Sequence, residues 1–122
     1  MALKFFITSQ ADGVAHLAGE GEATSTDFVP GALNPLEAVL GPGWNSRRVI
    51  VNMDQVTYLD SSAIGWLITS QKAFRAAGGY IVLHSLQPRV KQVLAMLRFE
   101  RVVPLADNAE AAREMIAAGA IC

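Results

Sequence analysis

Three consecutive polar residues, Asp60-Ser61-Ser62, stand between an apolar run and a segment with helical spacing. A hydroxyl or a phosphate is electrostatically favoured at such a junction, because the first N–H groups of a helix lack intrahelical partners and the helix dipole is positive there. The same residue types are also preferred N-caps, so capping alone can explain them. The two roles can coexist, and Ser61 is the candidate for a chemical switch.

The sequence contains no recognisable metal-binding, cofactor-binding or catalytic motif. His16 and His84 are isolated on predicted strands, without a second ligand at a spacing typical of metal sites. No G-x-S-x-G, Walker or Rossmann glycine pattern occurs, and the acidic residues are dispersed. We therefore expect no metal, no cofactor and no enzymatic activity.

The bulk properties predict a single domain over residues 1–122. The chain is 52% hydrophobic and 17% charged, which is enough to bury a core. Its net charge of −1 does not favour direct nucleic-acid binding. The lone cysteine, Cys122, precludes an intrachain disulfide, and no apolar run approaches the ~20 residues of a membrane span. These features predict a cytoplasmic protein without a membrane partner.

The first half of the chain predicts a hairpin, an irregular helix and a buried strand. Residues 3–8 and 14–18 flank Asp12-Gly13, a strong hairpin signal, and residues 19–22 are expected to break the second strand. N-cap types at 24–27 precede a helical set interrupted by prolines, and after a loop at 41–45 residues 47–53 predict the buried strand. The helical set consists of Phe28, Val29, Leu33, Leu36, Val39 and Leu40.

The second half alternates helices and strands. A helix after Ser61 is expected to end at Gly78-Gly79, before a buried strand at 80–84. Pro88 predicts the start of another helix, and Asp107 with Glu110 resembles a capping box that opens the last one. This order predicts an α/β fold whose later strands are parallel. The side chains expected to face inward are Ile64, Leu67, Ile68, Gln71 and Phe74, then Val90, Val93, Leu94 and Leu97, then Ala112, Met115 and Ile116.

From Gly19 to about Ile116 the chain resembles the STAS family, which includes anti-sigma factor antagonists and domains of sulfate transporters and stressosomes. The strongest element is Val56-Thr57-Tyr58-Leu59-Asp60-Ser61-Ser62-Ala63-Ile64-Gly65, similar to the family's V-T-F-hydrophobic-D-S-S-G-L-G. Gly19-Glu20-Gly21-Glu22 and Gly78-Gly79 support it. The chain departs from the family pattern at Glu22, Asn52 and Ala63. The resemblance implies a STAS-type fold, with a mixed sheet of four to five strands and about four helices.

The resemblance also implies a function. In the antagonist branch, the serine directly after the aspartate, here Ser61, is phosphorylated by an anti-sigma factor that is a serine kinase. The unmodified antagonist binds this kinase and frees a sigma factor, and a serine phosphatase resets the switch. The partner-binding surface is then expected to include Asp60, Ser61 and Ser62 with the outward helix residues Trp66 and Thr69. For Trp66 the competing interpretation is packing against a neighbouring helix.

Two other functions within the same family stay open at this stage. One is an unphosphorylated scaffold or accessory subunit, as in a stressosome or a lipid-transport complex. The other is a nucleotide-binding STAS domain, although no phosphate-cradling motif is present. The oligomeric state, the sigma factor and the stimulus cannot be read from a single chain.

Overall fold

One mixed sheet organises the molecule, a computed structural model that describes residues 3–11, 13–24 and 34–118. Within these residues five strands lie side by side in chain order. β1 pairs antiparallel with β2, and every later pair is parallel. This confirms the α/β class, the opening hairpin and the mixed sheet. The strands are β1 Lys4–Ala11, β2 Val14–Ala23, β3 Arg48–Leu59, β4 Tyr80–His84 and β5 Leu105–Ala106.

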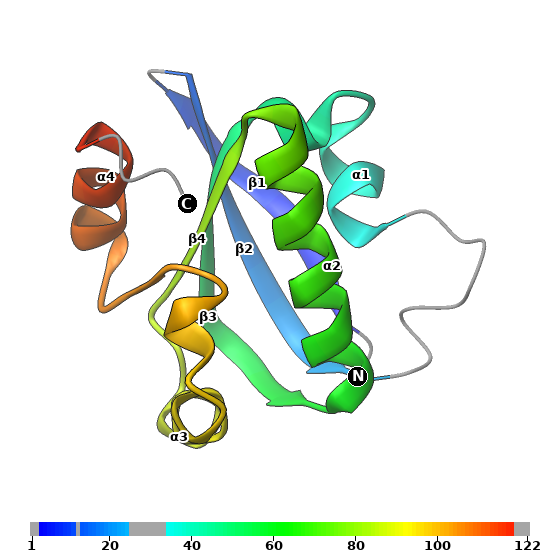
Figure 1. The fold of residues 1–122 in the computed structure, drawn as a ribbon, viewed down its shortest axis with the longest axis vertical. Helices are drawn as coiled ribbons and strands as arrows, with labels where there is room; N and C mark the ends of the chain where they lie inside the picture. Colours follow the sequence, from blue (N-terminus) through cyan, green and yellow to red (C-terminus); the bar gives the residue numbers. More distant parts are fainter. Residues whose placement is uncertain (1–2, 12, 25–33, 119–122) are drawn as a thin grey trace.

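The helices cover the two sides of this sheet unequally. In the described residues α1 and α2 lie on one side, α4 lies on the other, and α3 lies beside the end of β3 (Figure 1). Two 3-10 turns, η2 and η3, complete the described elements. The helices are α1 Pro35–Leu40, α2 Ser61–Ala77, α3 Pro88–Met96 and α4 Ala109–Ala117, and the turns are Trp44–Ser46 and Phe99–Arg101.

The larger core lies between the sheet and α1, α2 and α3. Alternate residues of the central strands, such as Leu17, Val51 and Leu83, point into it and meet Leu67 and Phe74 of α2. All five side chains are almost fully buried. The continuous Val49-Ile50-Val51 run is buried on both faces because β3 is central and helices cover both of its sides.

A smaller core lies under α4. Ala112 and Ile116 of this helix pack on Ile50 and Val82. The helix lies mainly on β3, β4 and β5, and Val14 joins the cluster at the start of β2. One short helix therefore covers only part of this face of the sheet.

Three strands run past their predicted ends, β1 to Ala11, β2 to Ala23 and β3 to Leu59. Residues 19–22 do not break β2, which continues to Ala23 through two register shifts against β3. Gly19 stays in the strand because the Phe5 ring occupies the place of its absent side chain: a Cβ there would lie 2.9 Å from Phe5 Cε1. β3 runs to Leu59, and beyond Asn52 it pairs with β2 alone.

Two helix starts also differ from the prediction. α1 begins at Pro35 with Asn34 as its N-cap, and residues 25–33, which include most of the predicted start, lie outside the described residues. α4 is capped by Asn108, whose Oδ1 accepts from the Ala111 N–H at 2.8 Å, and not by Asp107. The one-residue shift moves Glu110 too close to the cap for a capping box.

The end of α2 follows the prediction. Gly78 is the C-cap with φ +80°, the left-handed conformation that glycine adopts at low cost. Gly79 is needed for a different reason, since a Cβ there would lie 2.2 Å from the Asn45 carbonyl oxygen and 2.7 Å from that of Arg47. The C-terminal end of α2 thus packs closely against the backbone of the η2 turn.

The predicted inward stripe of α3 is only half correct. Val90 and Leu94 are buried, but Val93 is 40% and Leu97 54% exposed. α3 packs against the part of β3 that extends past β4, so it has a narrow contact and one i, i+4 pair fills it. In α2, Leu67 and Phe74 are core residues, whereas Ile64 and Ile68 are half-buried at its flank.

This difference in burial predicts different costs of truncation. Leu67→Ala should lower the free energy of unfolding by ~2–5 kcal/mol, because it opens a cavity in the larger core. Val93→Ala should cost less than about 1 kcal/mol, because its side chain is partly solvated. Urea unfolding curves measure both. Equal losses in the two variants would contradict the assignment of Val93 to the surface.

Candidate functional site

The junction between β3 and α2 is held by three hydrogen bonds around Asp60. Its carboxylate Oδ1 accepts from the Ala63 N–H at 3.0 Å, and its carbonyl accepts from the Ile64 N–H at 3.1 Å. Its own N–H donates to the Ala23 carbonyl at the end of β2, also at 3.1 Å. Asp60 is therefore the N-cap of α2, and it also ties the helix start to two strand ends.

Ser61 is the first residue of α2 and is exposed to solvent. Ser62 is half-buried, and Ala63 is completely buried. Of the two serines, Ser61 is thus the more accessible. The Ala63 methyl group points into the core, so this departure from the family pattern does not obstruct the surface around Ser61.

The other predicted partner-binding residues lie on different parts of α2. Thr69 is exposed two helical turns beyond Ser61, on the same side of the helix. Trp66 is half-buried at the flank, where it packs on the larger core. Its ring lies 5.7 Å from the Phe5 ring of β1, centroid to centroid. The structure thus brings Ser61 and Thr69 together on one ridge and places Trp66 beside it.

Gly65 lies between Ser61 and Thr69 on this ridge. A Cβ added to Gly65 would meet no atom within 4 Å. Internal packing therefore does not require glycine here, although glycine in a helix interior costs ~0.5–1 kcal/mol relative to alanine. We call Ser61, Gly65 and Thr69 the α2 ridge.

Sequence reasoning missed an apolar surface near this ridge. Tyr58 is 48% exposed, three residues before Ser61, and Met96 on α3 is 79% exposed. With the exposed Val93 and Leu97 they form what we call the α3 patch. Thr57, Tyr58 and Leu59 meet Arg89, Val90 and Val93 around a small cavity of about 100 Å³.

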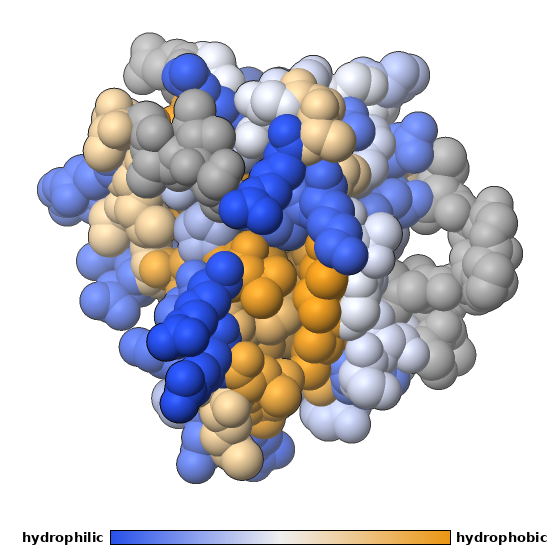
Figure 2. Space-filling model, in the orientation of Figure 1, coloured by the Kyte–Doolittle hydropathy of each residue, from blue (hydrophilic) through white to orange (hydrophobic). Residues whose placement is uncertain are grey.

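Apolar side chains gather between α2 and α3 on the face drawn in Figure 2. The helical period placed Val93 and Leu97 in the core, so no sequence signal pointed to the α3 patch except Met96, an apolar residue outside the predicted stripe. The α3 patch continues the surface along the end of β3 that leads to Ser61.

Comparison with known families decides the classification. The model of the STAS domain family matches residues 7–112. The chain belongs to the STAS domain family. The match covers most of the hairpin, the β3–α2 junction and the start of α4, so the STAS assignment made from the Asp60-Ser61-Ser62 motif is confirmed.

Two curated STAS relatives carry the name of anti-sigma factor antagonists. BtrV of Bordetella bronchiseptica is 30% identical over 66 residues, which are 54% of this chain and 57% of BtrV. A Thermotoga maritima protein is 26% identical over 77 residues, which are 63% of this chain and 66% of the relative. Each match thus spans less than two thirds of the relative's length.

Solved structures confirm the STAS fold. A crystal structure of the anti-sigma factor antagonist from Mycobacterium paratuberculosis superimposes with a TM-score of 0.68, at 16% identity, over 98% of this chain and 93% of that chain. The structure of a Thermotoga maritima protein named for the same role gives a TM-score of 0.71, at 21% identity, over 89% and 92%. At these identities the likeness concerns the fold.

The described part of the chain has neither a candidate membrane span nor a candidate metal cluster. None of its helices is both long enough and apolar enough to cross a bilayer. Nor does it contain a group of three or more His, Cys, Asp and Glu residues that could hold a metal ion.

The geometry of this junction predicts that the fold tolerates charge at Ser61 but not the loss of its cap. Ser61→Asp should keep the free energy of unfolding within about 1 kcal/mol of the wild type, because an acid in a first helical turn interacts favourably with the helix dipole. Asp60→Ala should lower it by about 1 kcal/mol. Thermal and urea unfolding measure both. A Ser61→Asp protein less stable than Asp60→Ala would contradict this assignment.

Proposed function

We propose that this STAS domain is an anti-sigma factor antagonist whose binding is switched by phosphorylation of Ser61. The observation that carries the proposal is the exposed Ser61 hydroxyl, presented by a capped helix start directly after Asp60. The names of the curated relatives support the partner class. The partner is an anti-sigma factor that is itself a serine kinase, and a serine phosphatase reverses the modification. We place this cycle in the cytoplasm.

The switch would act on the surface and leave the fold unchanged. A phosphate adds about −1.5 to −2 charges, which the first turn of a helix accommodates through its dipole and its free N–H groups. A partner that packs closely against the unmodified helix start could bind the phosphorylated form only by removing water from the phosphate charges, which costs free energy. Since ~1.4 kcal/mol changes affinity tenfold, the loss of a few contacts is enough to release the partner.

The α2 ridge and the α3 patch form the proposed contact surface. Ser61 lies between the strand end that carries Tyr58 and the exposed residues Gly65 and Thr69. An apolar area near a switchable hydroxyl gives affinity and control in the same place. The missing side chain at Gly65 would let a partner backbone approach the helix closely. Trp66 contributes at the margin, because Phe5 and the core cover part of it.

Site mapping tests the switch. Candidate anti-sigma factor kinases from the same genome are incubated with this protein and ATP, and the modified residue is located by mass spectrometry. We expect one phosphate on Ser61, none on Ser61→Ala and wild-type modification of Ser62→Ala. Ser61→Asp should weaken kinase binding at least tenfold in calorimetry while its unfolding curve stays close to that of the wild type.

The opposite results are equally informative. Modification of Ser62 in the Ser61→Ala variant would move the site by one residue. A kinase that binds Ser61→Asp and wild type equally would favour an unphosphorylated scaffold, whose assembly does not depend on this hydroxyl.

Gly65→Ala tests the close approach of the partner. The methyl group meets nothing within the domain, so the free energy of unfolding should rise by ~0.5–1 kcal/mol. If the partner packs on the α2 ridge, affinity should fall although the domain is more stable. Ala76→Ser, on the same exposed side near the helix end, is the matched control and should bind normally. Unchanged affinity in Gly65→Ala would place the contact elsewhere.

A further inference from the structure

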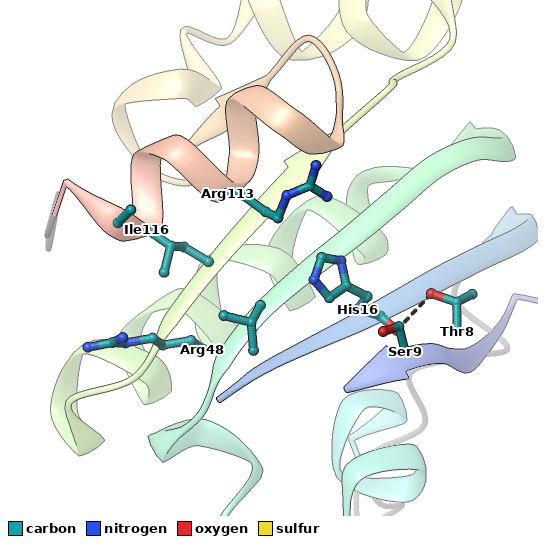
Figure 3. A pocket seen from close by; sticks show the side chains of 8 residues that line it. Thr8, Ser9, His16, Arg48, Arg113 and Ile116 are labelled. Atoms are coloured by element: carbon teal, nitrogen blue, oxygen red, sulfur yellow. Dashed lines mark hydrogen bonds between the residues drawn. The ribbon is translucent and has the colours of Figure 1, made fainter. Parts of the chain in front are cut away.

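A second concave surface lies on the side of the sheet opposite α2. It is a cavity of about 510 Å³ between the β1–β2 hairpin and α4. Figure 3 shows side chains from both hairpin strands, from the start of β3 and from α4 around it. The lining residues are Thr8, Ser9, Val14, His16, Arg48, Arg113, Ile116 and Ala117.

The cavity follows from the partial cover that α4 provides. This helix lies on β3, β4 and β5, so none of the described helices covers the hairpin side of the same face. Along β2, Ala15 and Leu17 point into the larger core, and His16 between them points to the α4 side. Ser9 is the register partner of His16 on β1. The uncovered strands therefore present polar side chains next to the edge of a helix.

The charges in the cavity are of one sign. Arg48 and Arg113 line it, and none of its described lining residues is acidic. The salt bridge in the described part of the chain joins Lys91 to Asp107, and no described carboxylate forms a salt bridge with either Arg48 or Arg113. The pKa of the nearby His84 is lowered, chiefly by burial, although Asp54 opposes the shift, and the charges of His16 and Arg113 lower it further. An anion bound here would give Arg48 and Arg113 oppositely charged partners.

The arginines stand apart. In Figure 3 Arg113 extends from α4 toward the side where His16, Ser9 and Thr8 lie, whereas Arg48 lies at the other end, beyond Ile116. Ile116 and Val14 are buried and give the space between the two ends an apolar wall. Thr8 Oγ1 donates to the His16 carbonyl at 3.0 Å, which holds this hydroxyl at the rim.

We propose that this cavity binds a small aliphatic anion with negative groups at both ends, such as a phosphorylated carboxylate. The volume suits a small metabolite, since ligand sites span roughly 300–1,000 Å³. Arginine pairs with phosphate and carboxylate through two parallel N–H donors, and the hydroxyl of Ser9 adds a polar partner. No Phe, Tyr or Trp is among the described lining residues, so a nucleobase has no large ring on which to stack. This site does not depend on the proposed function, because Ser61 lies at the start of α2 across the sheet.

Calorimetry with three probes tests the charge pattern. 3-Phosphoglycerate carries a phosphate and a carboxylate at opposite ends, glycerol 3-phosphate lacks the carboxylate, and AMP adds a nucleobase. We expect 3-phosphoglycerate to bind saturably with a Kd at or below about 1 mM. Glycerol 3-phosphate should bind at least tenfold more weakly, and AMP no more tightly than glycerol 3-phosphate.

Two variants and a matched control test the location. Arg48→Gln and Arg113→Gln should each weaken 3-phosphoglycerate binding at least tenfold, whereas Arg75→Gln, an exposed arginine of α2 on the far face, should leave it unchanged. All three arginines are exposed, so unfolding curves should confirm that the variants are folded. Absence of saturable binding, an equal loss in Arg75→Gln, or tighter binding of either of the other probes would overturn the proposal.

Discussion

The capping of α2 by Asp60 is the interaction on which the arrangement of the candidate site depends. Parallel strands end at the same edge of a sheet, so the ends of β2 and β3 meet where the chain must turn into the helix. At this point the Ala23 carbonyl accepts a hydrogen bond from the Asp60 N–H, and the Asp60 carboxylate accepts one from the Ala63 N–H. A capped turn fixes the direction of α2 and thereby the place of the Ser61 hydroxyl, before any partner is present.

The C-terminal end of α2 is also fixed by packing. This limits how a partner can detect the proposed phosphorylation of Ser61. Gly79 packs against carbonyl groups of the η2 turn, and Asn34 Nδ2 donates to Ser70 Oγ at 3.1 Å in the middle of the helix. A helix held at both ends and at its centre cannot tilt without breaking these contacts. We therefore favour a signal read directly at the helix start over one transmitted through the domain.

Local patterns predicted most of the fold and the position of Ser61, and the misses have physical reasons. The β-branched run at 49–51 predicts a buried strand, and the glycines at 78 and 79 predict the end of a helix. Both predictions were confirmed. Gly19 was read as a strand breaker because its neighbour Phe5 is distant in sequence and its packing could not be foreseen.

The predictions that concerned exposure were less successful. The period of α3 indicates which residues share a face, but not how much of that face the sheet can cover, so Val93 and Leu97 were placed in the core. The cavity lined by Arg48 and Arg113 was not predicted from the sequence for a similar reason. Its residues come from four separate elements, and only the tertiary fold brings them together.

The central β2–β3 pairing also has a consequence for how this chain reaches its native state. The β1–β2 hairpin closes through a short turn, and such hairpins form within about 1–10 μs. β2 and β3, in contrast, are separated by the whole stretch from Ala23 to Arg48, and their pairing must be completed before α2 has a surface to pack on. The rate-limiting step of folding should therefore be the docking of β3. Until it occurs, the apolar strands destined for the centre of the sheet are open to other chains, which makes this interval the period of greatest aggregation risk.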